Sequence, residues 1–277
     1  MKTGVRAILL ALASCSAMVS AALNVSPVIA AREGAQPATT VECFVFQPLD
    51  GSAPIVSSPT DCSEPRSPAS TFKVPHSLFA LETGVITPAT TMKWDGSKQS
   101  FPVWERDQQL DSAMKNSVLW FYQRVAPLIG RARMTAWLKK SHYGSDTYDG
   151  EQTQFWINGD LVISPIEQAD FLARMFRYEL PVSRAHVDAV AAAMLMPAGK
   201  ISNAAGIHDF AIGWPAATQV RAKTGSTLVK GERVMWLIGH LDAPKRTAVF
   251  AALVRSTATL PATAAIDLAR TYLAGRR

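Results

Sequence analysis

The sequence predicts an α+β fold, with an antiparallel sheet flanked by N- and C-terminal helices and a separate helical lobe. Three observations favour this fold. A β-rich segment, VECFVFQ, stands near the start at 41–47; apolar residues at helical spacing fill the middle of the chain; and short β-rich runs follow before a last amphipathic segment. We expect the late strands to form a hairpin sheet that pairs with the first strand.

Each element has a local signal. A turn at 48–54 follows the first strand, and a short second strand at 55–58 can pair back. The clearest helix start is Ser164, which is followed by Pro165 and by Glu167 in a capping box. We expect helices at Ser70 to about Thr83, 109–130, 133–141, 164–180, 183–196 and 262–275. We expect strands at 219–225, 233–241 and 246–254, and a loop at 93–107.

The composition is that of an ordinary globular protein. The chain has 277 residues, 48% of them hydrophobic and 18% charged, which is enough to bury a sizeable core. The formal net charge is +6, and it falls to +4 if Lys2 and Arg6 are removed with a leader. Basic residues are scattered, so nucleic acid is not an expected partner. No later segment is long and apolar enough to span a membrane. The sequence leaves the oligomeric state open.

The first 31 residues have the order of an export signal. MKTGVR supplies positive charge, a long apolar stretch follows, and VIAA at 28–31 offers small residues for cleavage. This order favours a signal over a buried N-terminal helix and predicts export to the periplasm. A second interpretation is a lipoprotein box, LASC at 12–15, with Cys15 as the anchored residue. The apolar stretch before it is short, so simple cleavage ranks higher.

The mature chain, 32–277, is expected to form a single region with two lobes. The sheet lobe would comprise about 41–66 and 205–277, and the helical lobe about 67–204. Cys43 and Cys62 would be its only cysteines, and in an oxidising compartment they can pair in a disulfide. The alternative is two buried free thiols, because sequence alone does not give their distance.

Ser70 and Lys73 form the first candidate catalytic pair. Residues three apart share a helix face, so the hydroxyl and the amine can meet. A serine hydroxyl needs a base to become a good nucleophile, and lysine can be that base if burial lowers its pKa. Phe72, Val74 and Leu78 supply apolar surroundings. Taken alone, S-x-x-K occurs often by chance, and a capping serine followed by a surface lysine is then the favoured interpretation.

Two further motifs make the combination specific. KTG at 223–225 lies on a β-rich run, and SVL at 117–119 lies in the middle helical region. S-x-x-K followed by K-T-G is typical of penicillin-binding proteins and serine β-lactamases. Over essentially the whole mature region the chain resembles the class D (OXA-type) serine β-lactamases. The matching segments are STFK at 70–73, ETG at 82–84, WD at 94–95, Ser117 in SVL, YG at 143–144, FW at 155–156, ISPIEQADFL at 163–172, KTG at 223–225 and WLIG at 236–239.

The resemblance implies a hydrolase that opens the β-lactam ring of penicillin-type antibiotics through an acyl-enzyme on Ser70. Lys73 would be the general base, in this class usually as N6-carboxylysine formed with CO2 or bicarbonate. Trp156 would donate its indole N–H to that carbamate. No other cofactor and no metal is implied. The five histidines are widely spaced, without H-x-H or H-E-x-x-H, which agrees with a metal-free site. Paired cysteines near Cys43 and Cys62 also occur in some members.

The remaining roles follow from the same resemblance. Ser117 would relay a proton to the β-lactam nitrogen. Lys223, Thr224 and Gly225 would form the edge that binds substrate, with Lys223 and Thr224 holding its carboxylate. The backbone N–H groups of Ser70 and Ser226 would form the oxyanion hole.

The chain departs from the class pattern at three places. Leu119 replaces a valine in the middle motif, a conservative change that should keep the substrate pocket dry. Ser145 replaces asparagine in the Tyr-Gly-Asn triplet, which weakens any role for that loop. Many members carry an arginine near the C-terminus that pairs with the substrate carboxylate; Arg255 is the best local candidate here, and a plain surface arginine is the alternative.

Two other functions share these motifs. A penicillin-binding transpeptidase or carboxypeptidase has the same serine, lysine and K-T-G, but is normally membrane-anchored and often longer. A drug-sensor domain is acylated without turnover and sits at the end of a membrane-spanning receptor. The predicted cleavable signal, the pairing of Lys73 with Trp156 and the modest length favour the β-lactamase.

Overall fold

The structure is a computed structural model in which residues 39–275 are described. The predicted signal at 1–31, with Cys15 of the alternative lipoprotein box, lies outside these residues. Within 39–275, no helix combines the length and apolar character needed to cross a membrane.

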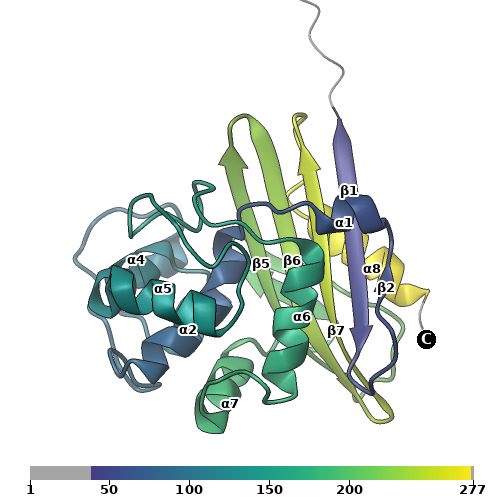
Figure 1. Ribbon diagram of the computed structural model, residues 1–277, viewed down its shortest axis with the longest axis horizontal. Helices are drawn as coiled ribbons and strands as arrows, with labels where there is room; N and C mark the ends of the chain where they lie inside the picture. The colour runs from purple at the N-terminus through teal and green to yellow at the C-terminus, as the bar shows by residue number, and fades with distance from the viewer. Residues whose placement is uncertain (1–38, 276–277) are drawn as a thin grey trace, which may run out of the picture. The chain divides into compact units, whose positions relative to one another are not determined.

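A five-stranded antiparallel sheet organises the described region, in the order β2-β1-β7-β6-β5 (Figure 1). The last three strands are consecutive hairpins of mostly apolar residues, and the N-terminal strand pairs with the last of them, as the sequence predicts. β5 is the edge strand nearest the helices α2 and α4. The strands are β1 (Thr40–Pro48), β2 (Ile55–Val56), β5 (Gln219–Val229), β6 (Glu232–Ala243) and β7 (Arg246–Ser256).

Two hydrophobic clusters cover the two faces of the sheet. Alternate residues of a strand point to opposite faces, so Val249 and Ala251 of β7 face one cluster and Phe250 and Ala252 face the other. The C-terminal helix α8 (Ala264–Ala274) packs on the second face. Both faces of β6 and β7 are therefore buried, which explains why their sequences lack polar alternation.

The other helices gather with the first cluster. They are α1 (Pro59–Ser63), α2 (Lys73–Glu82), α3 (Leu110–Lys115), α4 (Leu119–Ile129), α5 (Arg131–Lys140), α6 (Pro165–Phe176) and α7 (Arg184–Ala193). α6, expected in the helical lobe, instead packs against β1, β6 and β7 (Figure 1). Its apolar stripe, including Leu172 and Ala173, is buried there. Its capping box has the predicted geometry: Ser164 Oγ accepts from the Glu167 N–H at 3.2 Å, and the Glu167 carboxylate accepts from the Ser164 N–H at 2.8 Å.

The prediction of one helix over 109–130 is wrong. The chain leaves the helical conformation between α3 and α4, where Ser117 has a left-handed φ of 54° and Val118 is extended. Apolar periodicity continues through the break, so the pattern does not reveal it. The hairpin of β3 (Lys200–Asn203) and β4 (Gly206–Asp209) was also not predicted from the sequence.

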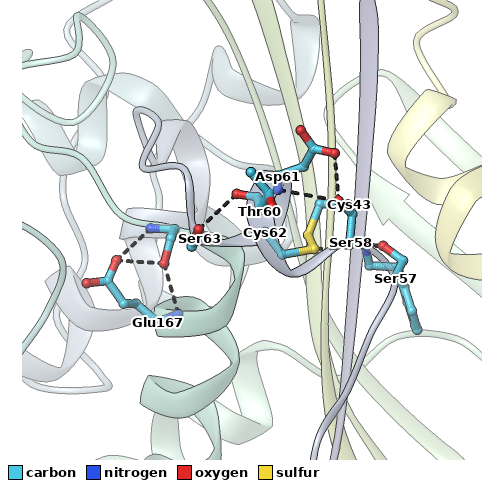
Figure 2. The surroundings of a disulfide bond; sticks show 10 residues. Cys43, Ser57, Ser58, Thr60, Asp61, Cys62, Ser63 and Glu167 are labelled. Atoms are coloured by element: carbon cyan, nitrogen blue, oxygen red, sulfur yellow. Dashed lines mark hydrogen bonds between the residues drawn. A yellow bond between two sulfur atoms is a disulfide. The ribbon is translucent and has the colours of Figure 1, made fainter.

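Cys43 and Cys62 form a disulfide between β1 and α1, with their Cα atoms 5.3 Å apart (Figure 2). Both side chains are buried. Ser58 caps α1 by accepting from the Asp61 N–H, so this short helix has a fixed start beside the strand. The disulfide joins the first strand to the segment that leads into Ser70.

Loss of this disulfide should cost about 3 kcal/mol of unfolding free energy, because it closes a loop of about 20 residues in the unfolded chain. Urea unfolding of Cys43→Ser/Cys62→Ser against the parent chain measures this difference. Reductant should destabilise the parent to the same extent and leave the double variant unchanged. Equal stability of parent and variant would contradict the prediction.

Candidate active site

Ser70 lies at the start of a helix whose first residues form a 3-10 turn, Ala69–Phe72, before α2 begins at Lys73. This arrangement brings Lys73 Nζ to 2.7 Å from Ser70 Oγ. Ala69, the residue before the serine, has a left-handed φ of 50°, which is uncommon for a residue with a side chain. Such backbone conformations persist where the surroundings over-determine them, and they cluster at functional sites.

Lys73 is completely buried. Burial holds the pKa of its amine well below the usual value, and the nearby charge of Lys223 lowers it further. Its Nζ also lies 5.3 Å from the ring centroid of Tyr122. A neutral amine can accept the hydroxyl proton at 2.7 Å, so the pair has the geometry and the electrostatics of a nucleophile with its base.

Two buried aromatic side chains beside Lys73 carry polar atoms without partners among the described residues. Trp156 is fully buried, and its Nε1 has no hydrogen-bond acceptor. His76, one turn along α2 from Lys73, packs edge-on against Trp156 at 5.4 Å, and neither of its ring nitrogens is paired. Burial, with the charge of Lys73, lowers the pKa of His76 to about 3, so the ring is neutral. No role for His76 is predicted from the sequence, although its spacing from Lys73 places both on one helix face.

Ser117 reaches the same site from the break between α3 and α4. Its Oγ accepts a hydrogen bond from Lys223 Nζ of β5 at 2.9 Å, and Lys223 also donates to the Thr224 carbonyl at 2.9 Å. Lys223 is 2% exposed, and burial lowers its pKa to about 7. Both lysines have a lowered pKa and each contacts a serine hydroxyl, so each can exchange a proton with its serine.

β5 approaches the start of the Ser70 helix closely at Gly225. A Cβ at this position would lie 3.0 Å from the Pro68 carbonyl oxygen and 3.2 Å from the Thr71 nitrogen. A side chain here would require these backbone atoms to shift by a few tenths of an ångström, which favours the glycine of the K-T-G segment. The sheet register is continuous here, and the Ala222 N–H bonds outward to Met194. The alternating pattern therefore directs the Ser226 N–H away from β6, toward the free edge beside Ser70.

A cavity of about 390 Å³ opens over these groups. Ser70, Ser117, Leu119, Thr224, Gly225 and Ser226 line it together with residues that the sequence did not single out as site residues. These are Phe101, Trp104, Ile157, Asn203, Ala204, Ala205, Thr227, Met235, Trp236, Ala262, Ala265 and Ile266. None of the lining side chains is charged. Most of the unpredicted residues come from loops and the β3–β4 hairpin, whose positions no local pattern reports.

Arg255 is not brought to this cavity. Its guanidinium pairs with Glu232 at 2.8 Å, and the side chain is 17% exposed. Glu232 also pairs with Arg66 at 3.0 Å. The proposed role of Arg255 in holding a substrate carboxylate therefore has no support from the geometry, because β7 directs the side chain into an internal ion pair.

The family model of the penicillin binding protein transpeptidase domain matches residues 46–271. Beta-lactamase OXA-20 of Pseudomonas aeruginosa is 34% identical over 208 residues, which cover 75% of this chain and 71% of that protein. The structure of the class D beta-lactamase BAT-2 matches with a TM-score of 0.73 and 27% identity, over 86% of this chain and 91% of that one. The C-terminal domain of the Bacillus licheniformis BlaR penicillin-receptor matches with a TM-score of 0.75 and 25% identity, over 86% and 90%.

The buried lysines should make the protein more stable as pH rises from about 7 to 10. In this window an unfolded Lys223 is protonated while the folded one is largely neutral, so the unfolded state binds more protons and stability increases with pH. Each such group contributes a slope of about 1.4 kcal/mol per pH unit.

The Lys223→Met variant should lose the Lys223 share of this slope, about 1.4 kcal/mol per pH unit, and urea unfolding at pH 7.5, 8.5 and 9.5 measures the difference. Lys230→Met is the matched control, because Lys230 is exposed and its removal should leave the slope of the parent. An unchanged slope in Lys223→Met would show that Lys223 is charged in the folded protein.

Proposed function

Because the chain belongs to the penicillin-binding protein transpeptidase family and, within it, to the class D β-lactamases, we propose that it hydrolyses penicillin-type β-lactams through a Ser70 acyl-enzyme. The observation that carries the proposal is the 2.7 Å contact between Ser70 Oγ and the buried amine of Lys73. The uncharged cavity above Ser70 is large enough to hold a small bicyclic ring system.

In acylation, Ser70 Oγ attacks the carbonyl carbon of the β-lactam while its proton passes to the base at Lys73. The negative charge that develops on the carbonyl oxygen is stabilised by the N–H groups of Ser70 and Ser226. The first N–H groups of a helix lack intrahelical partners, so that of Ser70 is available. The carbon–nitrogen bond then breaks, and the ring nitrogen takes a proton from Ser117, which Lys223 holds in place. The proton taken up at Lys73 returns to the Ser117–Lys223 pair, so Ser117 is protonated again and the base is free for deacylation.

The residues around Lys73 fit a carboxylated lysine. Only a neutral amine reacts with CO2, and burial keeps the Lys73 pKa low. The unpaired Nε1–H of Trp156 supplies a buried donor for an anionic oxygen. When present, the carbamate supplies an anionic oxygen base beside Ser70. Deacylation then requires a water whose proton is removed at the same place, after which the Ser70 ester is hydrolysed.

Export to the periplasm is part of the proposal. It rests on the charged, apolar and small-residue order of residues 1–31. The Cys43–Cys62 disulfide supports it, because such bonds persist in oxidising compartments.

A second candidate function is a penicillin sensor that is acylated without turnover. The similarity to the C-terminal domain of the BlaR penicillin-receptor favours it. Both functions predict acylation of Ser70, so only turnover distinguishes them.

Product formed per mole of enzyme in excess benzylpenicillin tests the proposal. Many turnovers, increased by bicarbonate in enzyme first depleted of CO2, are expected for a β-lactamase that uses a carboxylated lysine. A halt after about one product per enzyme, the stoichiometry of a stable acyl-enzyme, would favour the sensor.

Lys73→Ala removes the base for both steps. The variant should lose deacylation and retain only slow acylation. Intact-protein mass spectrometry should show the penicilloyl adduct of Ser70 persisting in the variant and clearing from the parent. Normal steady-state hydrolysis by Lys73→Ala would rule out this mechanism.

Trp156→Phe should raise the bicarbonate concentration needed for half-maximal activity by roughly 10- to 100-fold. This factor corresponds to the free energy of one charge-assisted hydrogen bond. Trp137→Phe is the control, because Trp137 stacks on Phe79 away from the cavity lining. An equal bicarbonate requirement in both variants would contradict the role of Trp156.

A further inference from the structure

A second pocket continues from the active-site cavity. It has a volume of about 410 Å³ and shares Ser226, Met235 and Ala262 with the first cavity. Its other lining residues are Leu228, Gly231, Arg233, Ser256, Thr257, Ala258, Thr259 and Leu260. A ligand that fills the space over Ser70 can therefore extend past Ser226 without leaving the protein surface.

Arg233 is the only charged side chain in the lining of either pocket. It is half-buried, and its side chain has no hydrogen bond or ion pair with the described residues 39–275. The neighbouring arginines differ, because Arg66 and Arg255 both pair with Glu232. The cation at Arg233 is thus uncompensated and faces an open pocket.

The sheet register places Arg233 within reach of the active site. Arg233 stands opposite Leu228 and Met235 opposite Ser226, so Arg233 and Met235 point to the same face, two residues apart. This spacing corresponds to about 7 Å along the strand. An extended arginine side chain covers a similar length, and Met235 lines both pockets, so the guanidinium can approach the end of the first cavity.

A penicillin-type substrate carries a carboxylate that needs a cation. Lys223 is an incomplete partner, because its Nζ already donates to Ser117 and the Thr224 carbonyl and its pKa is lowered to about 7. Arg255 is already in an ion pair with Glu232. A guanidinium binds a carboxylate through two parallel hydrogen bonds, and hydroxyl groups of Ser226 and Thr257 in the same lining can add donors.

We propose that the pocket beyond Ser226 is a carboxylate-binding extension of the active site, with Arg233 as its cation. The inference rests on the proposed β-lactam substrate and adds to it a preference for substrates with a carboxylate that reaches this pocket. Two carboxylates of such a substrate could bind there. One is the carboxylate on the β-lactam ring system, and the other is a carboxylate on the substrate's side chain.

Steady-state kinetics of Arg233→Gln with benzylpenicillin and its α-carboxy analogue test the proposal and distinguish the two sources. kcat/KM should fall about 10- to 100-fold, mainly through a higher KM. This factor corresponds to the free energy of one charge-assisted hydrogen-bonded pair. An equal fall for both substrates assigns the ring carboxylate to Arg233, and a fall for the α-carboxy analogue alone assigns the side-chain carboxylate. Arg233→Lys should recover part of the loss.

Lys230→Gln is the matched control, since it removes an exposed positive charge from the same β5–β6 turn outside both linings. If Arg233→Gln stays within about twofold of this control for both substrates, the proposal is overturned. Calorimetric binding of the ring-opened penicilloate to the parent and to Arg233→Gln does not require turnover. A chain that hydrolyses no β-lactam but binds penicilloate through Arg233 would contradict the proposed function and support the pocket.

Discussion

The close contact between Ser70 and the fully buried Lys73 is the interaction that the other parts of the site are built around. An amine is basic enough to take the Ser70 proton only if it is not already protonated, and burial of Lys73 provides that condition. The aromatic side chains Phe72, Tyr122 and Trp156 exclude water around it. The arrangement is costly, because a buried amine and unpaired polar atoms such as Trp156 Nε1 each disfavour folding. The surrounding core and the sheet must offset that cost.

The fold brings two distant segments to the helix start that carries Ser70 and Lys73. The helix start supplies Ser70, the break between α3 and α4 supplies Ser117, and the edge strand β5 supplies Lys223. Each segment has a local backbone feature that makes the approach possible: a left-handed residue before Ser70, a left-handed Ser117, and a glycine at position 225 where β5 meets the helix start. An edge strand suits this use, because its outward N–H groups are free to bind a ligand.

The charged side chains near the cavity over Ser70 are mostly paired with one another outside its lining. Glu232 pairs with both Arg66 and Arg255, and Glu64 also pairs with Arg66, so this network of two carboxylates and two guanidinium groups has no net charge. The described residues that line the cavity around Ser70 include no charged side chain. In a low-dielectric cavity, backbone donors and the two lysines interact with a substrate more strongly than they would in water. Arg233 lies just beyond this region, where a carboxylate can meet a cation without a charge being placed beside the reacting bond.

Local sequence patterns were enough to predict the candidate catalytic pair and most of the helices and strands. The spacing of Ser70 and Lys73, KTG on a strand and the capping box of α6 are local relations, fixed by the periods of helix and strand, and they predict contacts within one element. The tertiary structure decided which distant groups meet. Apolar periodicity ran through the break at Ser117, and nothing local showed that Arg255 would face Glu232 while Arg233 faced a pocket. Those outcomes depend on sheet register and on the partner across it, where a shift of one residue reverses the face of every side chain.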